Sequence, residues 1–210
     1  DRVCYTAERF ENDPADATSL SHNNVEAVYI AHDGSLWVAT RRGLNRFIPQ
    51  TRSFERITKG FKENEDYSDV FFTEINEDRD GNLWFGSTSG VFRMTPEQRH
   101  SHKRLNRYFH LEADPSSLST NRVVSLLVDN DNHVWAGTEN GGLNLYIPEL
   151  DNFRTFRIND YDPKSLNNES IHGIYQDKIG NLWVGTFAGG INMSKKNSGA
   201  CHAAQITPRT

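Results

Sequence analysis

The stretch Asp33-Gly-Ser-Leu-Trp-Val-Ala-Thr40 occurs in four versions along this chain. The other three are Asp80-Gly-Asn-Leu-Trp-Phe-Gly-Ser87, Asp131-Asn-His-Val-Trp-Ala-Gly-Thr138 and Ile179-Gly-Asn-Leu-Trp-Val-Gly-Thr186. Each version holds one of the four tryptophans, Trp37, Trp84, Trp135 and Trp183, which are therefore 47, 51 and 48 residues apart. A period of about 50 residues is typical of modules that cannot bury their apolar faces alone and stack on copies of themselves. The repeat predicts an array of four similar units.

The segments before each tryptophan have the composition of a β-hairpin. Apolar residues recur 12 and 9 positions before each Trp, in short β-rich runs that are typical of strands and too short for an average helix. A Gly or Asn follows, and these residues accept positive φ in a tight turn. The Trp then lies in the second strand. The apolar pairs are Val25 and Val28, Phe72 and Ile75, Val123 and Leu126, and Ile171 and Ile174.

A glycine six residues after each Trp is expected to open a second turn into a third strand, such as residues 44–48. A fourth run, at 54–57 or 153–158, completes the unit. Four antiparallel strands in about 50 residues make a β-propeller blade. We therefore predict an all-β fold built from four-stranded blades. The turn glycines are Gly43, Gly90, Gly141 and Gly189.

Two further positions are constant in kind. The residue two after each Trp is always small, which leaves room either for the indole or for the next blade. A leucine stands 17 residues before three of the tryptophans and is expected to pin an ordered linker. The small residues are Ala39, Gly86, Gly137 and Gly185, and the leucines are Leu20, Leu118 and Leu166.

The repeats divide the chain at about 19–58, 59–113, 114–161 and 162–194, with a blade remnant at 1–18 and a non-repeat tail at 195–210. The step from Asp1 to Phe10 matches those from Asn45 to Phe54 and from Asn144 to Phe153, so the chain is expected to begin inside a blade. Either this strand closes a ring of four blades, or the segment is an arc of a larger ring. The second is favoured because both ends fall within the motif.

The second repeat is irregular. It carries the segment 59–69 in place of the polar linker, and a further insertion at 97–107 that includes His100 and His102. Insertions of this kind are more typical of a tolerant surface loop than of a site. Two histidines without a third ligand are a weak signal for a metal.

Composition limits the classes of partner. The 210 residues carry a net charge of −5 with dispersed Lys and Arg, so we expect no nucleic-acid partner. No apolar run is long enough to cross a bilayer, and we expect no membrane contact. The two cysteines, Cys4 and Cys201, do not form a disulfide framework, although a single bridge between the chain ends stays open.

The run from Ser19 to Ile30, the phrase at 33–40 and the segment Gly43-Leu-Asn-Arg-Phe47 resemble the two-component regulator propeller repeat. The third and fourth copies resemble it as closely, with Gly141-Gly-Leu-Asn144 and Gly189-Gly-Ile-Asn192, whereas the second departs most. The resemblance implies the periplasmic sensor portion of a hybrid two-component histidine kinase of the Bacteroidetes type. It also implies ligands derived from glycan breakdown.

No catalytic motif for a hydrolase, nucleotide-binding enzyme, zinc protease or dithiol redox protein is present in the sequence. We therefore expect no enzyme and no cofactor. Asp129-Asn-Asp131-Asn-His133 has the spacing of a calcium loop but lacks its final glutamate, so these carboxylates are interpreted as hairpin caps and no metal is expected.

The turns after each second strand and the linkers before each first strand are expected at one end of the blades, because strands alternate in direction. This end is the predicted ligand surface of a non-enzymatic sensor, and presenting a homodimer interface is an alternative way for the segment to act. The rival hypotheses are a polysaccharide lyase or hydrolase and a pure interaction scaffold. The candidate ligand-binding residues are Arg41, Arg42, Glu139, Asn140 and Phe187.

Overall fold

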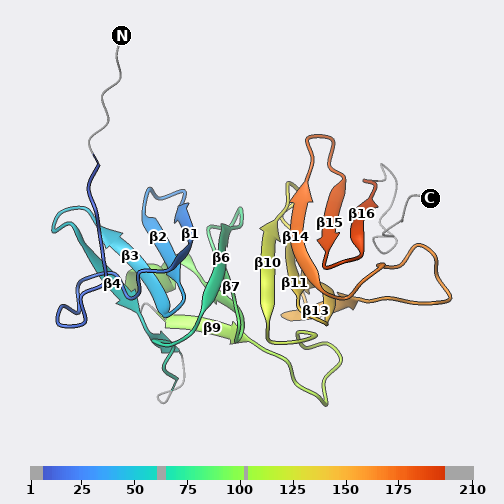
Figure 1. Cartoon of the computed structure of the whole chain (residues 1–210), viewed down its shortest axis with the longest axis horizontal. Helices are drawn as coiled ribbons and strands as arrows, with labels where there is room; N and C mark the ends of the chain where they lie inside the picture. The colour runs from blue at the N-terminus through green and yellow to red at the C-terminus, as the bar shows by residue number, and fades with distance from the viewer. Residues whose placement is uncertain (1–6, 61–64, 102–103, 197–210) are drawn as a thin grey trace, which may run out of the picture.

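A computed structural model describes residues 7–60, 65–101 and 104–196. They form four small twisted sheets that follow one another along the chain (Figure 1). The first has the order β1-β2-β3-β4, the second β5-β9-β8-β7-β6, the third β10-β11-β12-β13 and the fourth β14-β15-β16. The predicted all-β architecture of antiparallel propeller blades is confirmed.

The strand bounds repeat from blade to blade. The first blade comprises β1 (Val25–Ile30), β2 (Leu36–Thr40), β3 (Gly43–Ile48) and β4 (Ser53–Ile57). The second comprises β5 (Lys59–Gly60), β6 (Phe72–Glu77), β7 (Leu83–Ser87), β8 (Gly90–Met94) and β9 (Arg104–Tyr108). The third comprises β10 (Val123–Val128), β11 (Val134–Thr138), β12 (Gly142–Ile147) and β13 (Asn152–Phe156), and the fourth β14 (Ile171–Gln176), β15 (Leu182–Thr186) and β16 (Gly190–Ser194).

The first hairpin has one register in all four blades. Each Trp pairs with the residue eight positions before it, as Tyr29 does with Trp37 and Tyr175 with Trp183. The pairing also shifts by one residue at the same place in each blade, for example between Val25 and Ala27. This recurrent bulge increases the local twist of the inner strand.

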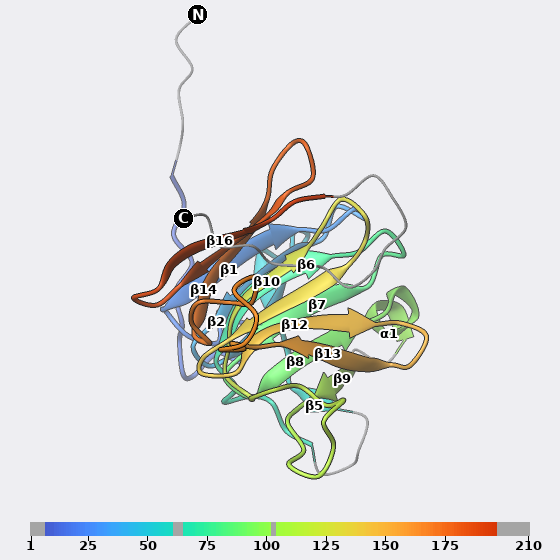
Figure 2. The ribbon, with the colours of Figure 1, turned by 90° about the vertical axis from the view of Figure 1, so that its right-hand side faces the viewer.

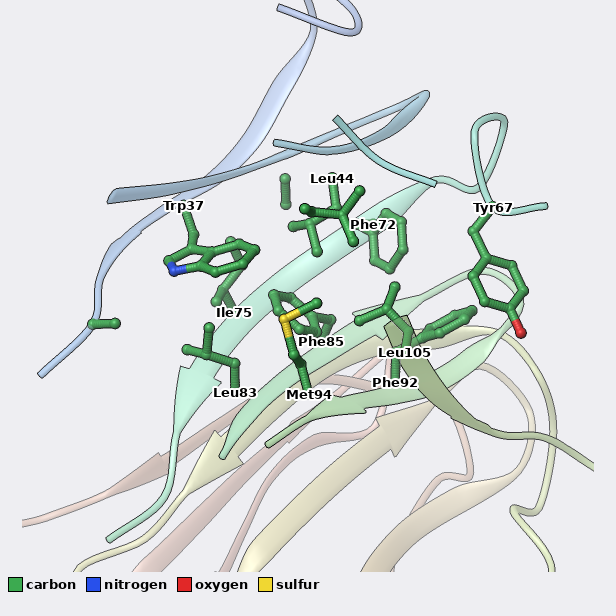
Figure 3. Packing of buried hydrophobic residues seen from close by; sticks show 13 residues of the cluster. Trp37, Leu44, Tyr67, Phe72, Ile75, Leu83, Phe85, Phe92, Met94 and Leu105 are labelled. Atoms are coloured by element: carbon green, nitrogen blue, oxygen red, sulfur yellow. The ribbon is translucent and has the colours of Figure 1, made fainter. Parts of the chain in front are cut away.

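Each of the first three blades buries its tryptophan face against the next blade. β1 packs on β6, β6 on β10, and β10 on β14. In the first of these junctions the indole of Trp37 lies 5.9 Å from the ring of Phe85, among buried residues of both blades (Figure 3). Burial of one such large side chain contributes about 1.5–3 kcal/mol. The blades are therefore held together mainly by apolar contacts between non-adjacent segments.

The small residue two after Trp84 and Trp135 makes room for the next blade. A Cβ built on Gly137 meets Ile171 Cγ2 of the fourth blade at 2.6 Å, and one built on Gly86 meets Val123 Cγ1 of the third at 3.1 Å. Of the two explanations left open by the sequence, the structure supports space for the neighbouring blade.

The buried indole N–H groups need acceptors, and the sequence interpretation missed the residues that supply them. Trp84 Nε1 donates to Asp78 Oδ2, Trp135 Nε1 to Asp129 Oδ2, and Trp183 Nε1 to Asp177 Oδ2, at 2.7–2.9 Å. Each aspartate lies six residues before its Trp. The first blade has Ala31 there, and Trp37 Nε1 donates to Ser35 Oγ instead. The signal was present as a polar residue at a fixed distance from an aromatic donor.

The four predicted turn glycines all lie at the second turn of their blades, but they have two different roles there. Gly43 and Gly90 have positive φ, of 102° and 120°, and open β3 and β8. In the third and fourth blades this backbone conformation falls one residue later, on Gly142 and Gly190. At Gly141 and Gly189 close packing leaves no space for a side chain, because a Cβ on either residue would lie 2.6 Å from a threonine hydroxyl.

The predicted insertion at 97–107 overlaps the sheet. A short helix, α1 (Pro96–Ser101), precedes β9, so residues 104–107 belong to the fourth strand rather than to a loop. In the side view of Figure 2, α1 and β5 lie at the outer edge of the stacked sheets. His100 Nδ1 lies 2.7 Å from Pro96 O within this helix, and His102 lies outside the described residues. The run at 153–158 is likewise shorter than expected, ending with β13 at Phe156.

The blades form an arc. The described residues do not pair the fourth sheet with the first, and the fourth sheet has three strands among them. Phe10 packs against Phe47 and Phe54 of the first blade, at 5.4 and 5.6 Å between ring centres. Tyr108 makes the matching contacts with Tyr146 and Phe153 of the third blade.

Phe10 therefore corresponds to Tyr108, at the end of a fourth strand, and the alignment of Phe10 with Phe54 was wrong. The described part of the remnant, residues 7–18, therefore lies against the first blade, in the place that the end of a preceding blade's fourth strand takes in the repeat. Cys4 and Cys201 lie outside the described residues.

Both ends of the arc expose residues that are buried at internal junctions. Val28 is 60% exposed, whereas its equivalents Ile75 and Leu126 are 4% and 5% exposed. Ile191 is 59% exposed, whereas Leu143 is fully buried. The open face of the first blade and the open face of the fourth blade are thus of the two kinds that pack against each other at the internal junctions.

Candidate ligand-binding surface

The turns after the second strands and the segments before the first strands lie together at one end of the blades. A backbone bond joins them in every blade, as from Arg41 N to Asn24 O at 3.1 Å and from Phe187 N to Ser170 O at 2.9 Å. The irregular second blade keeps the bond, from Thr88 N to Phe71 O at 3.0 Å. We call this the turn face.

Arg41 and Arg42 project from the turn between β2 and β3, and both have carboxylate partners. Arg41 Nε lies 2.7 Å from Glu26 Oε1, and its guanidinium lies 5.4 Å from the centre of the Phe71 ring. Arg42 Nε lies 3.1 Å from Asp69 Oδ1. Both pairs are solvent-exposed and therefore contribute little to stability, so a ligand anion can exchange with the carboxylate at small cost.

Glu139 and Asn140 follow β11 and differ in role. Glu139 pairs with Arg122 at the surface. Asn140 has φ of 56° and exchanges hydrogen bonds with Ser170 of the fourth blade, at 3.1 Å to its N–H and 2.7 Å to its Oδ1. Asn140 therefore joins two blades, which is a structural role that the sequence did not indicate.

Phe187 is an exposed ring in the turn between β15 and β16. It lies 5.4 Å from the His172 ring at an angle of 30°. The pair forms a small aromatic platform on the fourth blade, suited to stacking on an apolar ligand face. Among the described residues, no hydrogen bond, ion pair or ring contact joins the five predicted residues across different turns, so the structure does not gather them into one pocket.

One of the five lines a cavity. A space of about 300 Å³ opens on the turn face between the first blade and the segment preceding β6. Its lining combines two guanidinium groups, three hydroxyls and one carboxylate. The lining residues are Ser21, Arg42, Gly43, Leu44, Arg56, Thr58, Ser68 and Asp69.

A second cavity, of about 170 Å³, lies at the opposite end between the second and third blades. The Arg93 guanidinium reaches into its wall and lies 5.5–5.8 Å from the rings of Trp84, Tyr108 and Tyr146. Arg93 Nη1 donates to Tyr146 Oη at 2.7 Å. This cation and its three rings join the two blades, and the sequence interpretation missed them.

Both tyrosines of this cluster donate to Asp151 Oδ1, at 2.6 Å from Tyr108 and 2.5 Å from Tyr146. Burial, followed by these bonds to Asp151, raises the pKa of both phenols. They remain neutral donors at physiological pH, as a structural contact requires.

The group Asp129, Asp131 and His133 brings its ligand atoms within 4.8 Å of one another. Protein partners already use these atoms. Asp129 accepts from His133 Nδ1 and Trp135 Nε1, and Asp131 pairs with Lys196 Nζ at 2.7 Å. Asp129 Oδ1 also accepts from the backbone N–H of Asp131 and of His133, at 2.9 Å each. These bonds are those of a hairpin cap, as the sequence suggested.

Comparison with known families identifies the repeats. The family described as two component regulator propeller matches residues 19–42, 66–89, 117–140 and 165–188. A curated relative, histidine kinase P4 of Formosa agariphila, is 31% identical over 130 residues, which are 57% of this chain and 8% of the relative. This chain therefore spans a small part of that relative.

Two solved structures illustrate the fold. The extracellular domain of a putative hybrid two component system from B. thetaiotaomicron is 26% identical, with a TM-score of 0.69 over 87% of this chain and 23% of that one. Virginiamycin B lyase from Staphylococcus aureus is 16% identical, with a TM-score of 0.58 over 88% of this chain and 55% of the lyase, and at that identity it shows the fold alone.

Among the described residues, no helix combines the length and the apolar character needed to span a bilayer. The four family matches fall in register on the four blades, each reaching from the segment before the first strand to the turn after the second. The chain belongs to the two component regulator propeller family.

Proposed function

We propose that this chain is a non-enzymatic sensory propeller segment of a two-component signalling protein, located outside the cytoplasm. The observation that carries the proposal is the combined match of the four repeats and of most of the chain to an extracellular domain of a hybrid two component system. The relationship to a histidine kinase of Formosa agariphila supports the same role.

The ligand surface in this proposal is the turn face. Its turns share one backbone frame and differ in side chains, from the arginines of the first blade to Phe187 of the fourth. A constant frame with variable side chains is the arrangement expected of a recognition surface on a repeat scaffold. The ligands are small products of glycan breakdown, and their binding biases the conformational equilibrium of the attached signalling modules.

The test is a binding and turnover experiment on the 210-residue chain. The protein is incubated with a panel of oligosaccharides, and its melting temperature and the composition of each oligosaccharide are measured. We expect at least one fragment to raise the melting temperature, because a ligand that binds only the folded state stabilises it, and we expect the fragment to be recovered intact.

Two matched variants locate the contact. Phe187→Ala removes an exposed apolar side chain from the turn face, and Ile179→Ala removes one from the opposite end of the same blade. The first is expected to reduce the ligand-induced shift and the second to leave it unchanged. New reducing ends or unsaturated products in the mixture would instead support the lyase or hydrolase hypothesis, and a chain that no fragment stabilises would support the interaction scaffold.

A further inference from the structure

We propose that the cavity between the first and second blades binds the anionic group of a small, hydroxyl-bearing molecule, with Arg42 as the cation that recognises it. This inference rests on the proposed sensory function and specifies its ligand class. The site is the 300 Å³ space on the turn face described above.

The cavity arises from local departures from the repeat. The third blade has a turn that is one residue longer than that of the first, and its Asn140 bonds to Ser170 across the junction. The turn of the first blade has only two residues, Arg41 and Arg42, between β2 and β3 and lacks the third residue. The first junction is therefore open where the third is closed.

In the second blade, the arginine that is equivalent to Arg56 has a different partner. Arg107 on β9 matches Arg56 on β4, since each pairs with the third residue of the preceding strand. Arg107 Nε donates to Ser89 O at 2.9 Å and so closes its own turn. Arg56 bonds instead to the linker before β1, where its Nε donates to the Ser19 carbonyl and its Nη2 to the Asp16 carbonyl.

The two arginines of the cavity are therefore held differently. Several bonds to residues 16–20 fix the Arg56 guanidinium at the wall, including Nη2 to Leu20 O at 3.3 Å. Among the described residues, the Arg42 side chain pairs with Asp69 alone, and 62% and 78% of the two side chains are accessible. An incoming oxyanion can take the place of Asp69 on Arg42 and gain a bidentate contact there.

The remaining lining groups suit the rest of such a ligand. Ser21, Thr58 and Ser68 contribute hydroxyls, and Asp69, once released, accepts from ligand hydroxyls. The volume of about 300 Å³ is at the lower end of the range of small-molecule sites and exceeds that of two other cavities, of about 160 and 170 Å³. A single acidic sugar ring has the size and functional groups that this lining accommodates.

A carboxylate and a sulfate or phosphate ester share the oxyanion that the cavity requires. The test therefore uses four probes with one ring: galactose, galacturonate, galactose 6-sulfate and galactose 6-phosphate. Their dissociation constants for the 210-residue chain are measured by titration at low and high salt. We expect at least one acidic probe to bind about tenfold or more tightly than galactose, and this preference to shrink at high salt.

Arg42→Gln removes the cation, and Arg41→Gln is its matched control. Arg41 is the neighbouring residue of the same turn, is also exposed and paired with one carboxylate, and does not line the cavity. We expect Arg42→Gln to weaken the acidic probe about tenfold or more and Arg41→Gln to leave it unchanged. Arg42→Lys should recover part of the loss, because lysine keeps the charge without the bidentate geometry.

The inference is overturned if no acidic probe binds more tightly than galactose, or if Arg42→Gln and Arg41→Gln have equal effects. The oligosaccharide panel separates this failure from that of the proposed function. If a neutral fragment stabilises the chain equally well with and without Arg42 and no acidic probe is preferred, the sensor proposal stands and the anion site is rejected. If the chain binds no probe and no fragment, both proposals are rejected.

Discussion

Arg99 on the short helix α1 lies 3.0 Å from Glu77 on β6, and both side chains are almost completely buried. The same guanidinium reaches Asp33 of the first blade through Nη1 at 3.1 Å. Glu77 also accepts the backbone N–H of His32 from that blade, at 2.6 Å. A helix that belongs to no repeat thus connects the first two blades through one buried cation.

Arg99→Met is expected to destabilise the chain by about 3–5 kcal/mol, because it leaves the Glu77 carboxylate buried without a cation. Chemical denaturation measures the loss. The double variant Glu77→Gln with Arg99→Met should recover a large part of it, since no unpaired charge remains. A loss below about 1 kcal/mol in the single variant would show that the pair is not needed to join the blades.

Gly137→Ala is expected to lower the free energy of unfolding by about 1–3 kcal/mol, because its Cβ overlaps both Ser125 Oγ of the same blade and Ile171 of the next blade. Gly185→Ala is the matched control at the same position of the fourth blade. There the nearest atom is Gly173 O at 3.7 Å, so the added methyl fits and should be neutral or slightly stabilising. Equal effects of the two substitutions would contradict the assignment of this position to contact between blades.

The open faces of the first and fourth blades are expected to make the isolated chain self-associate. At internal junctions, faces of these two kinds pack against each other, so the exposed fourth-blade face of one molecule can pack on the exposed first-blade face of another. Ile191→Glu should lower the average mass in sedimentation velocity at a given concentration. Ile179→Glu, a change of another exposed apolar residue located in a hairpin, should leave it unaltered. A concentration-independent monomer in the unsubstituted chain would refute this expectation.

His133 and Asp129 are expected to give the stability a definite pH dependence. The hydrogen bond and charge of Asp129 raise the pKa of His133 above its usual value near 6.5. The stabilisation from protonated His133 is complete below that usual value and is lost as the pH rises through the raised value. The difference in unfolding free energy between the unsubstituted chain and His133→Asn should therefore shrink as the pH rises above about 6.5.

Asp129 shows the opposite shift. Burial raises its pKa, but the hydrogen bonds from His133 and Trp135 outweigh burial, and the net pKa is lowered. This contribution is present above the usual aspartate value and is lost as the pH falls through the lowered one. A histidine NMR titration with an unshifted or lowered midpoint for His133 would contradict the predicted dependence.

The blade pattern was largely predictable because it depends on residues close in sequence. The spacing of Trp37 from Val28 and from Gly43 fixes a hairpin and its following turn, and strand alternation follows from local backbone geometry. The shift of positive φ from Gly141 to Gly142 escaped prediction, because two adjacent glycines satisfy the same local preference and packing against Thr138 and Ser119 selects between them.

The candidate site was predictable only in part. The common end of the turns followed from strand direction, and Arg42 was correctly placed on that surface. Its pairing with Asp69, the inward packing of Asn140 on Ser170 and the cavity itself involve segments from different repeats. Side-chain partners across such junctions depend on how two blades approach, which local sequence patterns do not encode.

The amino-acid sequence by itself determined that this protein is a series of four β-blades that stack on one another, because that result needs only the period and the alternation of apolar residues. The tertiary structure alone decided that Arg99 connects two blades and that the first junction stays open. Both features arise where irregular segments meet the repeat, and there the energies of burial and charge pairing, rather than local backbone preference, select the arrangement.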